Sequence, residues 1–270
     1  MIHVIGNTGQ RSNQLFFFGH CLATAIDNKQ DICFWTLGIF VEEYACSCDK
    51  VNVIIKNPNI YIKCLRSIYK ILEKIGKFQD MSKLIQKAKT GKNVFFYSFY
   101  GWDRKNIDLV KNRSYIREFF EPQKKYIADV KKEIEKVREK YEYVIGVHIR
   151  RGDYRYWENG KYFFEFSQYK KWMEQTSVLM KKKGKSVFIV FSDENVPEGF
   201  CDEDFDILAY HGTAMEDQYF LSQCDYIIST ESTFAMWGQY MGKAKRACMR
   251  HVDTDIDEKT FQYLFEENEV

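Results

Sequence analysis

The stretch that decides the fold is Val144-Ile145-Gly146-Val147-His148-Ile149-Arg150-Arg151-Gly152-Asp153-Tyr154. Its first six residues are apolar apart from His148, which predicts a buried strand over 144–149. Two arginines, a glycine and an aspartate follow at once. Open parallel sheets bind their ligands beyond the carboxyl ends of the strands, so we expect chemistry at this junction.

The C-terminal half continues as a regular alternation of strands and helices. Further strands are expected at 187–191 and 226–228, and helices at 164–180, 216–224 and 233–241. This alternation predicts an α/β fold with a doubly wound, mainly parallel sheet.

The N-terminal half contains similar segments in a less regular order. Strands are expected at 2–5, 32–35 and 93–99, a helix at 13–26, and two Lys-rich helices within 61–90. Pro122 is placed at the first turn of a long amphipathic helix that runs to Tyr141, and its Lys/Glu-rich face is typical of a solvated surface. We therefore predict two α/β halves, 1–140 and 141–270, with the boundary near residue 140.

Composition places the 270 residues among ordinary globular proteins, with 45% hydrophobic and 29% charged residues. Forty basic against thirty-eight acidic residues give a net charge of +2, so we expect no nucleic-acid partner. The first residues show no secretory leader, and no apolar window of about 18 residues suggests a transmembrane segment. We expect a cytoplasmic protein with eight reduced cysteines, and peripheral contact with a membrane stays open.

Polar residues also follow two further predicted strands. The run 229–233, Ser-Thr-Glu-Ser-Thr, precedes a helix, and hydroxyls beside the free N–H groups of a helix start suit an anion. Asp193 and Glu194 follow another strand, where a nucleobase or a ribose could donate to them. The guanidinium forks of Arg150 and Arg151 suit phosphate oxygens. The alternatives are a strand-end ion pair for the arginines and helix capping alone for the hydroxyls.

Three segments resemble motifs of the α-1,2-fucosyltransferases, a family of the glycosyltransferase family 11 type that transfers L-fucose from GDP-fucose to galactosides. Residues 148–154 resemble its H-x-R-R-G-D-Y motif at every fixed position. Residues 8–16 are similar to its G-x-G-N-Q-L-F loop, with Ser12 in place of the second glycine. Residues 215–242 are similar to its M-S-x-C and N-S-T-F-S-W-W block, with Glu231 in place of the asparagine. We identify no motif in the stretch 30–140.

The resemblance implies the GT-B type of fold, two Rossmann-like domains that face each other across a cleft. Residues 1–140 would form the acceptor side, and residues 141–270 would bind the GDP-sugar. Within the implied donor site, Asp193 contacts the guanine, while Ser232 and Thr233 bind the phosphates. The full set of implied nucleotide-binding residues is Gly9, Gln10, His148, Arg150, Arg151, Asp193, Ser232 and Thr233.

Transfer of the sugar builds negative charge on the departing GDP, and fixed cations and N–H dipoles can stabilise that charge without a metal. An inverting transfer also needs a general base. Asp153 and Glu158 are the nearest carboxylates to the arginine motif, so the candidate catalytic residues are Arg150, Asp153 and Glu158.

Two further patterns raise the question of a metal ion. Asp202-Glu203-Asp204 has the Asp-x-Asp pattern of metal-dependent enzymes, and Cys46-Ser47-Cys48 is a close cysteine pair without further ligands at metal spacing. We expect no metal at either and no cofactor beyond the donor substrate, GDP-fucose. Another GDP-sugar or linkage on the same fold, and a non-catalytic homologue that binds a GDP-sugar or a glycan, stay open as alternatives.

Overall fold

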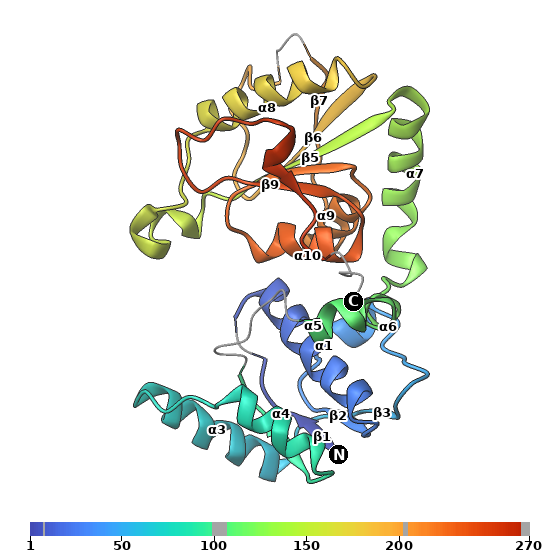
Figure 1. The fold of residues 1–270 in the computed structure, drawn as a ribbon, viewed down its shortest axis with the longest axis vertical. Helices are drawn as coiled ribbons and strands as arrows, with labels where there is room; N and C mark the ends of the chain where they lie inside the picture. Colours follow the sequence, from blue (N-terminus) through green and yellow to red (C-terminus); the bar gives the residue numbers. More distant parts are fainter. Residues whose placement is uncertain (8, 99–106, 202–204, 266–270) are drawn as a thin grey trace. The chain divides into compact units, whose positions relative to one another are not determined.

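The computed structural model describes residues 1–7, 9–98, 107–201 and 205–265. The chain divides into two compact units, Met1–Gln123 together with the C-terminal segment that begins at Phe265, and Lys124–Leu264 (Figure 1). The division precedes helix α7 (Lys124–Lys140), whereas the sequence placed the boundary near residue 140, after this helix. Val130 and Val137 of α7 pack into the core of the second unit, and this packing assigns the helix to it.

The first unit is built on a four-stranded parallel sheet in the order β3-β2-β1-β4. Its strands are β1 (Ile2–Val4), β2 (Ile32–Phe34), β3 (Val53–Ile55) and β4 (Val94–Phe96). Its helices are α1 (Arg11–Asp27), α2 (Phe40–Glu43), α3 (Ile60–Lys74), α4 (Met81–Lys89), α5 (Ile107–Lys111) and α6 (Arg113–Phe119). Only the short elements β3, α2, α5 and α6 were not expected from the sequence.

Aromatic side chains fill much of the core of the first unit. The rings of Phe18 and Phe34 lie 5.8 Å apart, and Phe34 lies 5.6 Å from Phe119 of α6. A separate cluster forms where Ile62 of α3 packs on Tyr97. Part of the aromatic excess of the sequence is therefore core rather than ligand-binding surface.

The second unit carries a six-stranded sheet in the order β10-β9-β8-β5-β6-β7, in which only β10 is antiparallel to its neighbour. The strands are β5 (Tyr143–Ile149), β6 (Ser186–Ser192), β7 (Ile207–Ala209), β8 (Tyr226–Ser229), β9 (Lys245–Cys248) and β10 (Phe261–Gln262). The helices are α8 (Phe166–Met180), α9 (Ala214–Ser222) and α10 (Thr233–Met241), with 3₁₀ turns η1 (Asp153–Arg155), η2 (Trp157–Gly160) and η3 (Glu258–Thr260). Helix α10 has the bounds predicted from the sequence, whereas β9 and β10 were missed.

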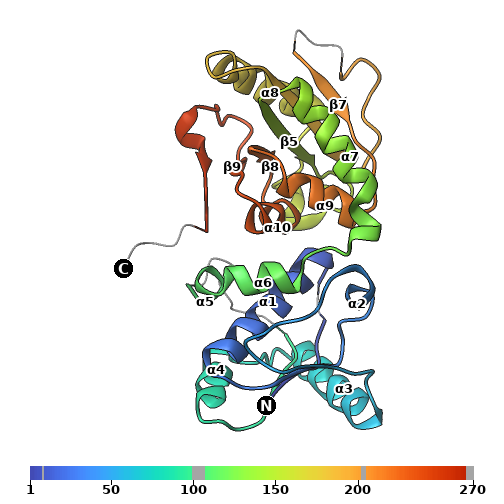
Figure 2. The same ribbon diagram turned by 90° about the vertical axis from the view of Figure 1, so that its right-hand side faces the viewer.

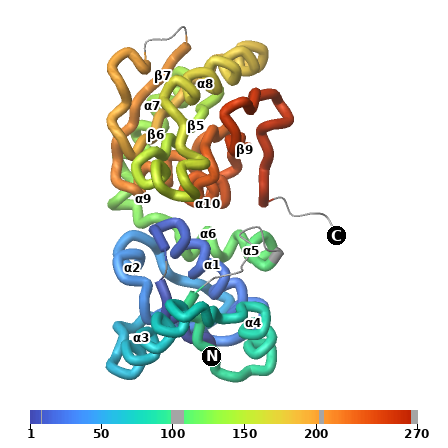
Figure 3. Tube along the Cα trace, turned by 90° about the vertical axis from the view of Figure 1, so that its left-hand side faces the viewer, coloured from blue at the N-terminus to red at the C-terminus, as the bar shows by residue number. Residues whose placement is uncertain are grey.

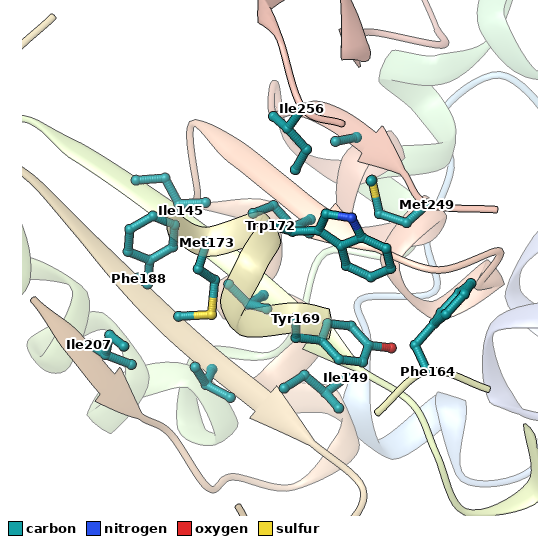
Figure 4. Packing of buried hydrophobic residues seen from close by; sticks show 14 of the residues in the cluster. Ile145, Ile149, Phe164, Tyr169, Trp172, Met173, Phe188, Ile207, Met249 and Ile256 are labelled. Atoms are coloured by element: carbon teal, nitrogen blue, oxygen red, sulfur yellow. The ribbon is translucent and has the colours of Figure 1, made fainter. Parts of the chain in front are cut away.

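Both faces of this sheet are buried, as a doubly wound fold requires. Ile145 and Ile149 of β5 pack against α8 (Figure 4), which covers one face in Figure 3. Helices α7 and α9 cover the other face (Figure 2). There β5 carries Gly146, because a Cβ at this position would lie 2.7 Å from the Cδ2 atom of Leu221 in α9.

Two remaining features bear on the sequence analysis. Pro122 does not lie in the first turn of α7, which begins at Lys124, but pairs with Tyr44 in an isolated β-bridge. Among the helices of the described ranges, none combines the length and the apolar character that crossing a bilayer requires.

Candidate active site

The three predicted strand ends meet at one edge of the second sheet. Strand β5 lies between β8 and β6, and all three run parallel. The register pairs His148 with Ser229 of β8, and Ile149 with Ser192 of β6. The residues that follow these strands are therefore neighbours at the carboxyl edge, where α/β sheets bind ligands.

Arg151 anchors the loop after β5 inside the protein. Its side chain is only 8% exposed, and its Nε donates to Glu194 at 2.9 Å. Its Nη1 donates to the carbonyl oxygen of Phe164 and to the carboxylate of Glu165, both at 2.8 Å. These contacts tie the end of β5 to the end of β6 and to the start of α8.

Asp193 shapes the turn that follows Arg151. Its Oδ1 accepts a hydrogen bond from the backbone N–H of Arg151 at 2.8 Å, and its Oδ2 accepts one from Gly152 at 3.2 Å. A Cβ on Gly152 would lie 3.1 Å from this Oδ2, so the glycine permits the close approach. The contact between Asp193 and a guanine, which the resemblance implies, stays a prediction.

Arg150 is held on the side of the β8–α10 turn. Its Nε donates to Asp153 at 2.8 Å, and its guanidinium lies 5.4 Å from the ring centre of Tyr154. The hydroxyl of Tyr154 donates to the carbonyl oxygen of Glu231 at 2.6 Å, which links the two loops. Burial opposes the charge of Arg150, but Asp153 raises the pKa of the guanidinium, so it stays cationic.

The hydroxyls at the start of α10 have different environments. Ser232 is buried and is the N-cap, because its Oγ accepts a hydrogen bond from the N–H of Phe234 at 3.2 Å. Thr233 is the first helical residue and is half-buried. Ser232 therefore caps the N-terminus of α10, and Thr233 is the first residue of the same helix.

His148 is a buried, neutral imidazole. Its ring stacks on Phe234 of α10 with ring centres 4.9 Å apart. Burial, together with the positive charges of Arg150 and Arg246, lowers the pKa of His148 to about 3. Its Nδ1 is buried and has no hydrogen-bond partner within the described residues. His148 therefore does not supply positive charge near neutral pH.

Arg246 is a cation that the sequence analysis missed. It lies on β9 opposite Ile227, is 3% exposed, and donates to the hydroxyl of Ser229 at 3.2 Å. It forms no ion pair with a carboxylate in the part of the chain that the structure describes. Its charge acts on His148 and helps Arg250 to lower the pKa of Glu231 against the effect of burial. Nothing in the run Lys243–Arg250 distinguished a buried arginine from exposed ones.

The candidate catalytic carboxylates are placed differently. Asp153 is half-exposed and pairs with Arg150. Glu158 is exposed within η2, where its φ of 50° is in the left-handed region, and its carboxylate makes no ion pair among the described residues. The structure thus joins Asp153, but not Glu158, to Arg150.

Gly9 and Gln10 belong to the first unit and lead into α1. Gly9 has a φ of +82°, which favours glycine, and its carbonyl oxygen accepts a hydrogen bond from the side chain of Gln14 at 2.8 Å. Gln10 is the N-cap position of α1, and both residues are exposed. Their contact with a diphosphate stays a prediction.

The possible metal ligands are partly beyond what the structure describes. Asp202 and Asp204 lie outside the described residues. Within the described ranges, no group of three or more His, Cys, Asp or Glu side chains is arranged to hold a metal ion. Burial raises the pKa of Cys46 to about 12, so this member of the Cys-Ser-Cys run is a protonated thiol.

Several solved structures with a similar fold are fucosyltransferases. The chain resembles NodZ, an α-1,6-fucosyltransferase soaked with GDP-fucose, at 13% identity and a TM-score of 0.57 over 96% of each chain; another NodZ structure is from Bradyrhizobium. It resembles POFUT1 in complex with GDP-fucose at 11% identity and a TM-score of 0.57, covering 92% of this chain and 95% of POFUT1. It resembles a mutant of Arabidopsis thaliana FUT1 in complex with GDP at 12% identity and a TM-score of 0.58, covering 91% and 69%.

At these identities the likeness concerns the fold alone, and it confirms the predicted α/β fold of the GT-B type. No curated protein matches this chain in sequence. The model of one protein family, described as glycosyl transferase family 11, matches residues 43–262, which include β5, its arginine motif and the whole of α10. The chain therefore belongs to glycosyl transferase family 11.

Proposed function

We propose that the protein transfers L-fucose from GDP-fucose to a galactoside hydroxyl of a glycan or surface polysaccharide, with inversion and in an α-1,2 linkage. The observation that carries the proposal is the placement of Arg150, which Asp153 orients beside the β8–α10 turn. Membership of glycosyl transferase family 11 and the fold shared with fucosyltransferases support it. In this proposal the second unit binds the donor, and the first unit forms the acceptor side.

The proposed chemistry relies on fixed positive charge near the leaving diphosphate. Arg150 offers charged N–H donors, and the N-terminus of α10 offers backbone N–H groups and a partial positive charge. Arg246 adds a buried cation, hydrogen-bonded to Ser229 at the end of β8. Together they would stabilise the charge that develops on GDP as the sugar leaves, without a metal.

The other predicted nucleotide contacts enter the proposal with distinct tasks. Asp193 and Arg151 hold the loop that carries Arg150, and Gly9 and Gln10 are proposed to direct backbone N–H groups at the same diphosphate. Asp153 and Glu158 both remain candidates for the general base. The eight cysteines are free thiols, which supports the proposed cytoplasmic location.

Two alternatives compete with this proposal. The fold is shared with an α-1,6-fucosyltransferase and with POFUT1, so a different linkage or acceptor is one of them. A protein that binds a GDP-sugar or a glycan without transfer is the other. The presence of both motif arginines and of Asp153, which pairs with Arg150, favours an enzyme over a binding protein.

The proposal predicts acceptor-dependent release of GDP from GDP-fucose. The assay incubates the full chain with GDP-fucose or GDP-mannose, with and without a panel of galactosides, and in the presence or absence of EDTA. We expect turnover with GDP-fucose and a β-galactoside, a product linked at the 2-hydroxyl by NMR, and no effect of EDTA. Turnover with GDP-mannose alone, or a product linked elsewhere, would favour the first alternative. GDP-fucose binding without release under every condition would favour the second.

Arg150→Lys should lower kcat/KM for GDP-fucose by about 10-fold or more, because lysine keeps the charge but loses the planar fork. The matched control is Arg155→Lys, since the Arg155 side chain is 48% exposed and its ion pair with Glu194 is long, at 3.6 Å. Kinetics and calorimetric GDP binding measure both variants. Unchanged values for Arg150→Lys would remove Arg150 from the donor site.

Ser232→Ala and Thr233→Val should separate capping from phosphate binding. Loss of the Ser232 cap should lower stability by about 0.5–2 kcal/mol. Loss of the Thr233 hydroxyl should weaken GDP binding by about 10-fold, equivalent to about 1.4 kcal/mol, with little change in Tm. Calorimetry with GDP and thermal unfolding measure the two effects. If Thr233→Val binds GDP like the wild type, its hydroxyl is not a phosphate ligand.

His148 should make the protein sensitive to acid. Its pKa lies far below that of an unfolded histidine, so the unfolded chain takes up a proton first as the pH falls below about 6.5, and stability is lost. Between pH 7 and pH 5 this group should cost about 2 kcal/mol. Urea unfolding of the wild type and of His148→Phe at both pH values measures the contribution. An equal loss in both proteins would contradict it.

A further inference from the structure

Helix α3 of the first unit (Figure 1) and its C-cap residue Ile75 carry a row of isoleucines that are exposed to solvent. Ile60, Ile68, Ile71 and Ile75 are 77%, 52%, 60% and 63% exposed. With the exposed Cys64 they recur at spacings of three and four, so they lie along one side of the helix. We call these four isoleucines the α3 stripe.

The α3 stripe is separate from the face by which α3 packs on its own unit. Ile62 is buried against Ile5 and Tyr97, and Leu65 and Tyr69 pack at the edge of the same cluster. Folding of the unit therefore uses another side of the helix. The stripe is apolar surface that the described chain leaves uncovered, and such surface commonly marks an interaction site.

A row of lysines runs beside the stripe. Lys63, Lys70 and Lys74 are exposed and recur at spacings of seven and four, and none of them forms an ion pair within the described residues. Residues 60–92 contain nine Lys and Arg against two Asp and Glu, a local charge of +7 in a chain whose net charge is +2. The positive charge of the protein is thus concentrated on the segment that also carries the exposed isoleucines.

We propose that the α3 stripe and its lysine row bind the surface of an anionic lipid bilayer. An amphipathic helix of this kind lies parallel to the membrane, with apolar side chains at the boundary of headgroups and acyl chains and lysines at the lipid phosphates. This surface goes beyond glycosyl transfer and does not depend on which sugar is transferred.

The pattern of charge and apolar side chains favours an anionic bilayer over a second copy of the chain and over a nucleic acid. A second copy of the chain packed symmetrically on the stripe would bring two lysine rows close together, and like charges repel. A nucleic acid would use the lysines but would leave four isoleucines without a partner. An anionic bilayer offers acyl chains to the α3 stripe and lipid phosphates to the lysine row.

Vesicle sedimentation of the full chain tests the proposal. The probes are vesicles of phosphatidylcholine alone and vesicles of phosphatidylcholine and phosphatidylglycerol in equal parts. We expect binding to the anionic vesicles, little binding to the neutral ones, and weaker binding as salt is raised, because salt screens the lysines. Equal binding to both vesicles, or binding to neither, would overturn the proposal.

Matched variants locate the surface. Ile71→Gln should weaken vesicle binding, whereas Val178→Gln on α8 should not, although the two side chains are equally exposed at 60% and 58%. Lys70→Glu with Lys74→Glu should lower the partition coefficient by about 10-fold or more. The control for charge is Lys181→Glu with Lys182→Glu, at the exposed end of α8.

Two further measurements distinguish lipid binding from loss of folding and from self-association. Thermal unfolding and GDP binding of each variant should match the wild type, because the substituted side chains are exposed and distant in sequence from the arginine motif. Light scattering reports the oligomeric state of the wild type and of Ile71→Gln. A dimer that Ile71→Gln dissociates, or an equal loss of vesicle binding in the control variants, would overturn the assignment of the surface to a membrane.

Discussion

The candidate site depends on the buried guanidinium of Arg151. Two carboxylates and one carbonyl oxygen surround it, and these acceptors belong to the end of β6 and to the start of α8. A buried charge is costly unless it is paired and hydrogen-bonded, so removal of one of these partners would destabilise the fold. The loop after β5 is thereby fixed in one conformation, and Asp193 holds its backbone from the same side.

Strand geometry explains why two adjacent arginines have different surroundings. Side chains alternate across β5, so Ile149 faces α8 while His148 stacks on Phe234 of α10. Arg151 points to the α8 side, where its contacts lie, and Arg150 sits over Tyr154, which is bonded to the β8–α10 turn. One arginine thus organises the loop, and the other is left beside the start of a helix.

Much of the fold was predictable because its signals are local. The apolar run of β5 and the hydroxyls before α10 identified these elements close to their observed bounds, and the Lys-rich pattern of 61–90 indicated that two helices, α3 and α4, lie there. Strand β9 was missed because Lys245-Arg246-Ala247-Cys248 has no apolar run, and its place in the sheet comes from pairing with β8. Pro122 was misplaced because its partner, Tyr44, is distant in the sequence.

The sequence predicted which strand ends form the candidate site. It did not predict what each side chain of the site does. The motif does not distinguish Arg150 from Arg151. Only the tertiary structure shows that Arg151 is buried and bonded to Glu194. Sequence proximity alone nominated Glu158, and the structure leaves it unconnected to Arg150. Arg246 gave no local signal, because burial of a strand arginine depends on neighbours that are distant in the sequence, here Ser229 of the adjacent strand β8.

The balance of charge at this edge of the sheet follows from these placements. Arg151 pairs with two carboxylates and Arg150 pairs with the half-exposed Asp153, whereas Arg246 forms no ion pair among the described residues and acts on Glu231 through its charge alone. Arg246 is thus a buried cation whose charge no ion pair offsets within those residues. Desolvated positive charge beside a helix N-terminus is unfavourable on its own, and an anion bound there would offset the cost. The same arrangement that lowers the pKa of His148 would therefore strengthen the binding of a diphosphate.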